Sequence, residues 1–377
     1  MDFDFSPEEE AFREEVQAFI AENLPPESER GPDFQAQWDA KLVEKKWLGF
    51  ALPEEEGGGG GTLVEQFILK EEMSKAQAPP IGNDFMGLTW VAPALIMHGS
   101  EAQKRRFLPD LLNGRSYWCT GLSEPDVGSD LASLQTRAVR DGDDYVINGS
   151  KIWTSYAHEA DWIYMLVRTD PDAETRYKGI TCLLVPMDAE GLEVHPIINI
   201  AGLHHFNQVF FTDVRVPLEN RLGAEGDGWR VGMGALAHER SGISEAHVLE
   251  RKLDALKELA REVQRNGKPA SEDTELRRTF ARYETLVSAM RLNALRNLTR
   301  QMQGNHPGSE TSVNKLLRGY LETPLYDTAM GLLGNDANTW DEWQEMSLRF
   351  HSNIIGGGSP NIQRNIIAER ILGLPKD

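Results

Sequence analysis

The chain has 377 residues, of which 26% are charged and 40% are hydrophobic, and its formal net charge is −20. This length and composition are typical of a globular protein with two or three lobes. The negative charge argues against nucleic acid as the main partner, because binding to a phosphate backbone depends on clustered Lys and Arg. No apolar run approaches the ~18–20 residues that a membrane-spanning helix needs, so no membrane span is expected.

The first 117 residues have the pattern of a helical domain. Ser6-Pro7-Glu8-Glu9 combines an N-cap residue, a proline at the first helical position and a glutamate placed for a capping box. Helical spacing recurs in three later segments, residues 64–76, 92–97 and 101–112. The glycine run 57–61 is not followed by Lys-Ser/Thr, so we interpret it as a mobile loop between helices rather than a phosphate cradle.

The N-terminus and the cysteines bear on the compartment. The sequence is acidic from Asp2 onward, which argues against a signal or transit peptide. Its two cysteines, Cys119 and Cys182, are too few for a disulfide framework and favour a reducing compartment. We therefore expect a cytoplasmic protein.

The pattern changes to β structure between residues 118 and 222. Strand-like segments alternate with turn signals at residues 134–139, 145–147, 163–167, 181–185, 192–198 and 209–214. Asp141-Gly142-Asp143 predicts a hairpin turn, and Asn148-Gly149 predicts a second tight turn of type I′. Because no helical pattern separates these segments, we expect an antiparallel barrel or sandwich.

Helical spacing returns after Asp227-Gly228-Trp229. Met233, Leu236 and Ala237 begin a long helix, and further helices are expected at residues 276–302, 312–333 and 361–372. The predicted fold is α+β with three domains: an N-terminal α-helical domain (1–117), a middle antiparallel β-barrel or sandwich domain (118–222) and a C-terminal four-helix bundle (223–377).

Two short motifs in the β domain carry the functional signal. Ser123-Glu124-Pro125 and Gly128-Ser129-Asp130 place small residues and hydroxyls where a backbone can approach a ligand closely. Either motif alone is more often a structural turn, and Trp153 alone is more often a core aromatic. Their combination in this order, between two helical halves, is much harder to explain by chance.

This stretch closely resembles the flavin-binding region of the acyl-CoA dehydrogenase family, whose signature is Thr/Ser-Glu-Pro-x-x-Gly-Ser-Asp followed by Asn-Gly-x-Lys-x-Trp-x-Thr/Ser. The resemblance extends from Phe3 to Pro375 and includes the closing segment IQRNIIAERILGLP. It implies a helical, a β and a second helical domain in that order, with FAD as the cofactor. It also implies α,β-dehydrogenation of an acyl-CoA thioester, with electrons passed to an electron-transfer flavoprotein.

The resemblance assigns cofactor contacts to eight positions: Thr120, Leu122, Ser123, Ser129, Trp153, Ser155, Ser359 and Asn361. Backbone at Thr120 and Leu122, with the Ser123 hydroxyl, would bond the pyrimidine edge of the isoalloxazine ring. That edge gathers negative charge on reduction, so hydrogen-bond donors there favour hydride uptake.

The remaining assignments concern the flavin ring and its phosphates. Trp153 would pack on the ring, and Ser155, where the family more often has Thr, would reach toward N5. Ser129 would lie near the pyrophosphate and the CoA moiety, which makes it a substrate-binding candidate as well. Ser359 and Asn361 would offer polar contacts from the C-terminal loop.

The chain departs from the commonest family pattern at the catalytic base. There the C-terminal loop carries a glutamate, and alignment on Ile362-Gln363-Arg364 puts Gly357 in its place, with only the backbone N–H left to polarise the thioester carbonyl. A minority of the family has the base on the first long helix after the β domain, where Glu239-Arg240 aligns with its Glu-Arg pair. A single Glu is by default an exposed acid. The missing acid at Gly357 nevertheless favours Glu239 as the base, with Arg240 ordering the substrate site.

Other departures leave three interpretations open. Of the Arg-x-x-Phe-Gly motif that a neighbouring subunit supplies in the family, only Gly267 survives, with Val263 and Asn266 at the Arg and Phe positions. The chain is therefore either an active dehydrogenase in a homo-oligomer (dimer or tetramer), or a half-site or non-catalytic subunit of a heterotetramer with a paralogous subunit. A flavin oxidase or monooxygenase of the same fold is the third interpretation, and His238 is its only support.

The substrate is less legible from the sequence. Gly356 and Gly357 replace a large aromatic residue and an acid of the family pattern. This loss of side-chain volume predicts a wide acyl pocket, for a branched, cyclic or otherwise bulky acyl-CoA.

Overall fold

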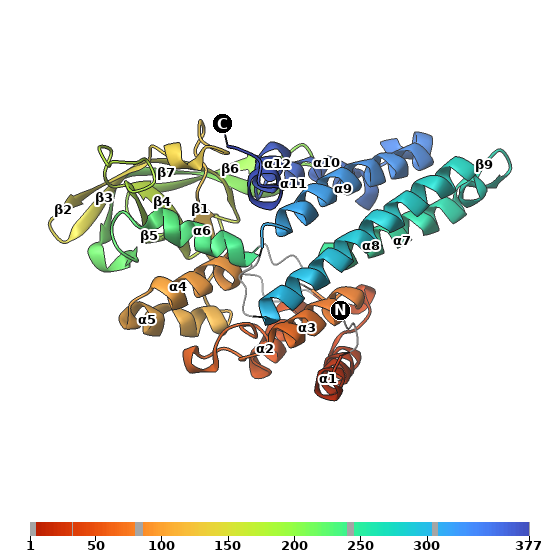
Figure 1. Cartoon of the computed structure of the whole chain (residues 1–377), viewed down its shortest axis with the longest axis horizontal. Coiled ribbons are helices and arrows are strands. Elements are labelled where there is room, and N and C mark those ends of the chain that lie inside the picture. The colour runs from red at the N-terminus through yellow and green to blue at the C-terminus, as the bar shows by residue number, and fades with distance from the viewer. Residues whose placement is uncertain (1–4, 32, 80–85, 240–244, 304–307, 377) are drawn as a thin grey trace. The chain divides into compact units, whose positions relative to one another are not determined.

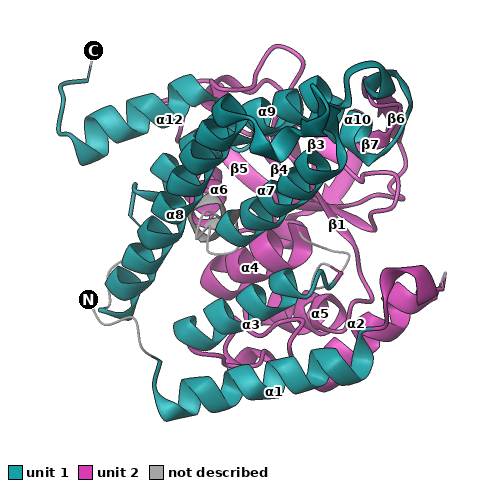
Figure 2. Cartoon of the chain, turned by 90° about the vertical axis from the view of Figure 1, so that its right-hand side faces the viewer, with its two compact units in different colours: residues 1–24, 63–78, 240–377 teal, residues 25–62, 79–239 magenta. Residues whose placement is uncertain are grey.

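The computed structural model describes residues 5–31, 33–79, 86–239, 245–303 and 308–376 (Figure 1). The chain divides into two compact units (Figure 2), of which unit 1 comprises residues 1–24, 63–78 and 240–377 and unit 2 comprises residues 25–62 and 79–239. The N-terminal helices are therefore shared between the units. Helices α1 (Pro7–Asn23) and α3 (Leu63–Lys75) belong to unit 1, whereas α2 (Phe34–Glu44), α4 (Ala92–His98) and α5 (Glu101–Leu112) belong to unit 2.

Unit 2 contains an eight-stranded sheet in the order β6-β7-β3-β2-β4-β5-β8, with β1 paired to β4. Its strands are β1 (Trp118–Gly121), β2 (Arg137–Asp141), β3 (Asp144–Ser155), β4 (Trp162–Arg168), β5 (Ile180–Pro186), β6 (Leu192–Ile198), β7 (His204–Pro217) and β8 (Arg221–Leu222). Most neighbours are antiparallel, as expected, but β1 and β2 each run parallel to β4. The β1–β4 pair is possible because the β2–β3 hairpin lies between the two strands in the chain and provides the long connection that such a pair needs.

Both faces of the central strands are buried. Tyr164 and Leu166 of β4 lie in the cluster that packs against the helices, whereas Ile163, Met165 and Val167 lie in the cluster on the other face. Helices α4, α5 and α6 (Gly228–Glu239) lie along one side of the sheet in Figure 1. Alternation of side chains along each strand thus builds two cores from one sheet.

The tight turn expected at Asn148-Gly149 is wrong, because both residues lie inside β3. The register with β7 shifts between Ile147 and Gly149, so the pair forms a bulge in a continuous strand. Gly149 has φ of +144°, and a Cβ there would lie 2.7 Å from the Thr136 hydroxyl oxygen. Asn148 exchanges two 3.0 Å hydrogen bonds with Asp213 of β7, which hold the bulge in the sheet.

The glycine run 57–61 is an ordered loop rather than the mobile one expected. Amides of its last four glycines donate to backbone carbonyls of the preceding segment, residues 49–53. A Cβ at Gly58 would lie 2.2 Å from the Leu52 carbonyl oxygen. Glycine is therefore needed for close packing of backbone on backbone.

Unit 1 is helical. Besides α1 and α3 it contains α7 (Glu245–Glu262), α8 (Thr274–Met302), α9 (Thr311–Leu333), α10 (Glu342–Arg349), α11 (His351–Ile355) and α12 (Pro360–Ile366). The Ser6–Glu9 capping box predicted for the first helix is present. Leu253, Val287 and Leu321 bring α7, α8 and α9 together in one buried cluster. None of the described helices is long and apolar enough to cross a membrane.

An ion-pair network centred on the buried Glu71 of α3 joins four helices of unit 1, α1, α3, α7 and α8. The Glu71 carboxylate lies 2.7 Å from Arg13 of α1, 3.0 Å from Nε2 of His247 on α7, and 3.5 Å and 3.4 Å from Lys75 and Arg291. Burial raises the pKa of Glu71, but its hydrogen bonds and positive neighbours outweigh burial and lower that pKa well below its usual range.

We expect His247→Gln to destabilise unit 1 most at low pH. Burial lowers the pKa of His247, but Glu71 and Glu250 more than offset this, so the folded pKa is raised. A raised histidine pKa contributes stability that is complete below the unfolded value and is lost as pH rises through the folded value. The free energy of urea unfolding should drop by about 1.5–3 kcal/mol at pH 6 and by less at pH 9.

The matched control for this variant is His195→Gln. His195 is 57% exposed, forms an ion pair with exposed Glu193 and contacts the Phe210 ring, so its loss should change the free energy of unfolding by less than about 0.5 kcal/mol. A difference between His247→Gln and wild type that stays constant from pH 6 to pH 9 would contradict the expected linkage.

Candidate functional site

The loop that follows β1 is fixed by a buried lysine. Lys151 of β3 is fully buried, and its ammonium donates to the Leu122 carbonyl oxygen at 3.1 Å and to Glu124 Oε1 at 2.8 Å. The Ser123 carbonyl oxygen accepts from the Ile152 amide at 2.9 Å. Two neighbouring residues of β3, Lys151 and Ile152, thus hold the loop at the predicted cofactor residues Leu122 and Ser123.

Glu124 links this loop to the start of β2. Its carboxylate accepts from the amides of Gln135 and Thr136 at 2.6 Å and 2.8 Å, in addition to the Lys151 bond. Burial raises the pKa of Glu124, but Lys151 and the two amides outweigh burial and lower it. Burial lowers the pKa of Lys151 to about 8 despite its glutamate partner. No functional role was expected for either residue, although Glu124 stands in the Ser-Glu-Pro motif and Lys151 in the Asn-Gly-x-Lys motif.

Trp153 has an unusual backbone conformation, and its side chain is exposed to solvent. The register between β3 and β7 shifts between Lys151 and Thr154, and Trp153 within this bulge has φ of +59°. A left-handed conformation costs a non-glycine residue about 1–3 kcal/mol. Trp153 is 56% exposed, and its indole and the Phe206 ring form an edge-to-face pair at 5.8 Å between centroids. An exposed aromatic ring is suited to stacking on a planar ligand.

Ser155 and Thr120 lie in the same sheet as this indole. Ser155 ends β3 opposite Phe206 of β7, is half-buried, and has its hydroxyl 3.1 Å from Nε2 of His205. Thr120 lies in β1, paired with Tyr164 of β4. Thr120, Trp153 and Ser155, which are predicted to contact the flavin ring, thus belong to strands of one sheet.

Ser129 lies in the exposed loop between β1 and β2. The next residue, Asp130, accepts from the Ser133 hydroxyl at 2.6 Å and from Arg176 at 2.9 Å, which anchors the loop. A Cβ at Gly128 would meet nothing within 4 Å, so the surface there is open to a ligand.

The predicted base lies at the limit of the described structure. Glu239 is the last residue of α6, and the side chains of His238 and Glu239 lie outside what the structure describes, as does Arg240. Helix α6 itself packs on strands β4 and β5. A Cβ at its first residue, Gly228, would lie 2.5 Å from the Thr181 carbonyl carbon, so the helix starts directly against the sheet.

The glycine loop of unit 1 is fixed by Gln363 of α12. This buried side chain donates from Nε2 to the carbonyl oxygens of Gly357 and Gly358 at 3.1 Å and 3.2 Å. The two glycines have φ of +69° and +100°. A Cβ at Gly357 would lie 3.5 Å from Cε of Lys315, an ordinary contact. There is room for a side chain at Gly357, but the left-handed backbone disfavours one.

Ser359 and Asn361 start helix α12. Ser359 is the N-cap, and its hydroxyl accepts from the Ile362 amide at 3.5 Å. Asn361 is exposed, and its side-chain oxygen accepts from Arg364 at 2.8 Å. Both predicted cofactor contacts therefore also have local structural roles.

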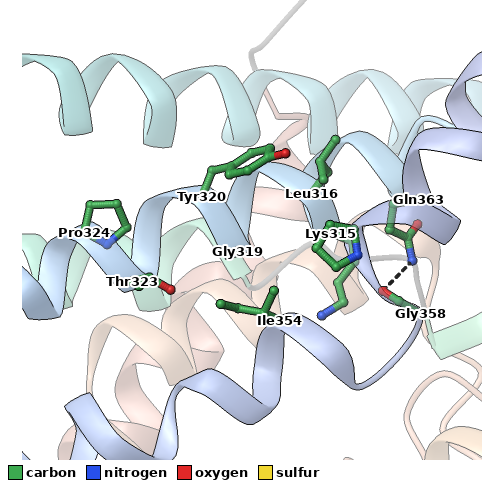
Figure 3. A pocket seen from close by; sticks show the side chains of 10 residues that line it. Lys315, Leu316, Gly319, Tyr320, Thr323, Pro324, Ile354, Gly358 and Gln363 are labelled. Carbon is green, nitrogen blue, oxygen red and sulfur yellow. Dashed lines mark hydrogen bonds between the residues drawn. The ribbon is translucent and has the colours of Figure 1, made fainter. Parts of the chain in front are cut away.

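A cavity of about 320 Å³ adjoins this loop within unit 1 (Figure 3). Helices α9, α11 and α12 and the loop contribute its lining: Lys315, Leu316, Gly319, Tyr320, Thr323, Pro324, Ile354, Gly358, Pro360 and Gln363. Thr323 Oγ1 and Gln363 Oε1 are buried without a hydrogen-bond partner in the described part of the chain. The volume is at the lower end for a small-molecule site.

The eroded Arg-x-x-Phe-Gly segment forms a small hairpin. Strands β9 (Gln264–Arg265) and β10 (Lys268–Pro269) pair across Asn266 and Gly267, which have φ of +53° and +76°. This is the geometry of a type I′ turn. Arg265 donates to the Gly331 carbonyl oxygen near the end of α9 at 2.7 Å. The only residue of the family motif that is retained, Gly267, thus serves the turn.

The residues of unit 2 fit a flavin ring. An exposed indole face, a nearby Ser155 hydroxyl and a loop pinned by Lys151 are present in one sheet. Among the described residues, no group of three or more His, Cys, Asp or Glu is placed to hold a metal ion.

Comparisons with known proteins identify the family of the chain. Three family models match: acyl-CoA dehydrogenase N-terminal domain at residues 6–115, middle domain at 119–214 and C-terminal domain at 226–372. Acyl-CoA dehydrogenase IpdE1 of Mycobacterium tuberculosis is 38% identical, over 98% of both chains. The ChsE4-ChsE5 complex of the same organism matches with a TM-score of 0.86 at 31% identity, and the Tcur3481-Tcur3483 steroid ACAD with 0.85 at 32%, each covering 100% of both chains.

The chain therefore belongs to the acyl-CoA dehydrogenase family, whose members are flavoproteins. It is an acyl-CoA dehydrogenase, an oxidoreductase of lipid catabolism, as the resemblance implied. The predicted α+β fold with helical, β and helical domains is confirmed.

Proposed function

We propose that the chain catalyses FAD-dependent α,β-dehydrogenation of an acyl-CoA thioester. The observation that carries the proposal is Trp153, an exposed indole in a left-handed backbone beside the Ser155 hydroxyl. Bound FAD would supply the hydride acceptor, and an electron-transfer flavoprotein would take the electrons onward. Thr120, Leu122 and Ser123 would hold the pyrimidine edge of the ring, and Ser359 and Asn361 would offer polar contacts to the cofactor.

The chain's own residues would move the proton. An α C–H beside a thioester is a very weak acid, so its carbonyl must be polarised and its base must be desolvated. We assign proton removal to Glu239 and the ordering of the substrate to Arg240 and Ser129. The Gly357 N–H is proposed as a donor to the thioester carbonyl.

The substrate class in this proposal is a branched, cyclic or otherwise bulky acyl-CoA. Gly356 and Gly357 remove side-chain volume from the C-terminal loop, and both are exposed. One similar solved structure is titled a steroid ACAD, which supports a ring-bearing acyl group for this chain as well.

The assembly is proposed together with the division into domains 1–117, 118–222 and 223–377. The first candidate assembly is a homo-oligomeric dimer or tetramer. One specific observation supports a second candidate, a heterotetramer with a paralogous subunit. The hairpin at residues 264–269 uses Arg265 to cap α9 and offers no arginine at Val263. Two similar structures carry two-component names, ChsE4-ChsE5 and Tcur3481-Tcur3483. A cytoplasmic location, consistent with two buried free thiols, completes the proposal.

The test is the flavin content of the chain expressed and purified alone. We expect a yellow protein with flavin and chain in equal amounts. Anaerobic addition of acyl-CoA should bleach the flavin absorbance, and ring-bearing or branched acyl groups should bleach it faster than short straight ones. The measurement is visible absorption after denaturation for flavin content, followed by stopped-flow absorbance for the acyl-CoA panel.

Each other outcome has a defined meaning. A folded, colourless chain would favour the second candidate, a subunit that binds flavin only with its partner. A strong preference for a short straight acyl chain would contradict the bulky-substrate assignment. Rapid oxygen consumption by the reduced protein would favour a flavin oxidase or monooxygenase instead.

A further inference from the structure

Two histidines of β7 differ in their hydrogen-bond partners. His204 and His205 are successive residues of the strand, at a bulge where the register with β6 shifts between Ile197 and Ile198. His204 Nε2 lies 2.7 Å from Asn207 Oδ1, whereas His205 Nε2 lies 3.1 Å from Ser155 Oγ. Of these two side chains, only His205 contacts a residue with an assigned role in the reaction.

The His204 contact has a fixed direction. Asn207 is fully buried and donates from Nδ2 to the Thr154 carbonyl oxygen at 3.1 Å, which leaves Oδ1 to accept from His204. The His158 ring stacks on His204 at 3.8 Å between centroids and accepts at Nδ1 from the same Asn207 amide. Both the nitrogen and the oxygen of the Asn207 amide are thus engaged in hydrogen bonds that have a structural role.

The His205 ring is held just as firmly but has an adjustable partner. Tyr156 stacks on it at 4.6 Å between centroids and 28° between planes, and the Tyr156 amide donates to the His205 carbonyl oxygen at 3.0 Å. The Phe206 ring lies 4.4 Å away on the neighbouring residue. A hydroxyl can donate or accept, so the ring decides which way the Ser155 proton points.

Serine needs such a constraint more than a β-branched residue would. Its χ1 angle has three staggered wells and no γ-methyl to exclude any of them. Ser155 is at the end of β3, directly before Tyr156, which has φ of +53°. Nothing in the strand itself selects one rotamer, whereas the bond to His205 does.

We propose that His205 is a positioning residue, which holds the Ser155 hydroxyl in one orientation toward the redox group of the reaction. The inference rests on the role proposed above for Ser155 beside flavin N5. When Nε2–H of His205 donates to Ser155 Oγ, the hydroxyl proton is left to donate elsewhere. The geometry thereby lets a rigid, stacked ring set the donor direction of a flexible side chain.

The test uses His205→Phe, which keeps the ring stack on Tyr156 and removes the hydrogen bond. In the flavin-loaded enzyme we expect kcat to fall about five- to tenfold with KM within about twofold, the effect of losing one neutral hydrogen bond. His205→Phe with Ser155→Thr should recover most of this loss, because the γ-methyl restricts χ1. The absorption spectrum of the bound flavin should change in His205→Phe and return toward wild type in the double variant.

A second readout is independent of flavin. In the flavin-free chain labelled with [15N]histidine, Ser155→Ala should shift the His205 imidazole resonances and leave those of His195 unchanged. Absence of that shift would overturn the hydrogen bond even in a chain that binds no flavin, so failure of this inference is distinguishable from failure of the proposed function. Equal kcat and equal flavin spectra in wild type and His205→Phe would also overturn it, as would a double variant no better than His205→Phe. His195→Ala removes an exposed histidine with no assigned role and serves as the control with unchanged activity.

Discussion

Replacing Glu239 with glutamine should abolish turnover while leaving the flavin bound. Glutamine keeps the size and shape of the side chain but cannot accept the α-proton of the substrate. Removing a general base costs about 10²–10⁴-fold in rate, and this step has no second acid at Gly357 to replace it. We expect kcat to fall about 10³-fold or more, measured as anaerobic flavin bleaching by a competent acyl-CoA.

Binding measurements and two further variants serve as controls for this prediction. Flavin content and acyl-CoA binding should match wild type, because the substitution alters neither the sheet nor the glycine loop. Glu258→Gln removes an exposed acid of α7 that pairs with Arg261, and activity should be unchanged. His238→Gln tests the neighbouring histidine independently of Glu239, because His238 would be the base of a monooxygenase. Unchanged turnover in Glu239→Gln would end the assignment of Glu239 as the base.

Replacing Glu124 with alanine should be among the most destabilising single changes in unit 2. It leaves the Lys151 ammonium buried with only the Leu122 carbonyl and leaves two amides, of Gln135 and Thr136, without their acceptor. Breaking a buried ion pair by removing one partner costs about 3–5 kcal/mol. The expected loss should be measured as the free energy of urea unfolding, and flavin content should fall because the Leu122–Ser123 loop loses its anchor.

A matched exposed pair and a double variant test the explanation. Lys178→Ala at the exposed Glu174–Lys178 pair should cost less than about 0.5 kcal/mol. Glu124→Gln with Lys151→Met should cost less than the sum of the single changes, because it removes both charges together. Additive single effects would show that the two side chains are not coupled and would contradict this account of the loop.

The Glu124–Lys151 pair also makes the stability of the fold depend on pH. The pKa of Glu124 is lowered in the fold, so its contribution is complete above the unfolded pKa and is lost as pH falls through the folded value. This is opposite to His247, whose contribution is lost as pH rises. The two groups therefore limit stability on the acid and the alkaline side respectively.

Helix positions and the order of domains were predictable because the signals are local. The helix predicted at residues 101–112 matches α5, and that predicted at 312–333 differs from α9 by one residue at its start. Apolar spacing and caps act within one or two turns of chain, so the sequence carries them directly. Asn148-Gly149 failed for the opposite reason. The same dipeptide forms a turn or a bulge according to which strand lies beside it, and here Asp213 of β7 decides.

The sequence by itself determined the family, the candidate contacts and the absence of an acid at position 357, because these depend only on residue type and order. Only the tertiary structure revealed the buried Glu124–Lys151 pair, the left-handed Trp153 and the contact of His205 with Ser155. Each of these joins positions at least 27 residues apart or depends on a strand register shift. Such contacts exist only once strands pair, since pairing alone determines which side chains meet across a sheet.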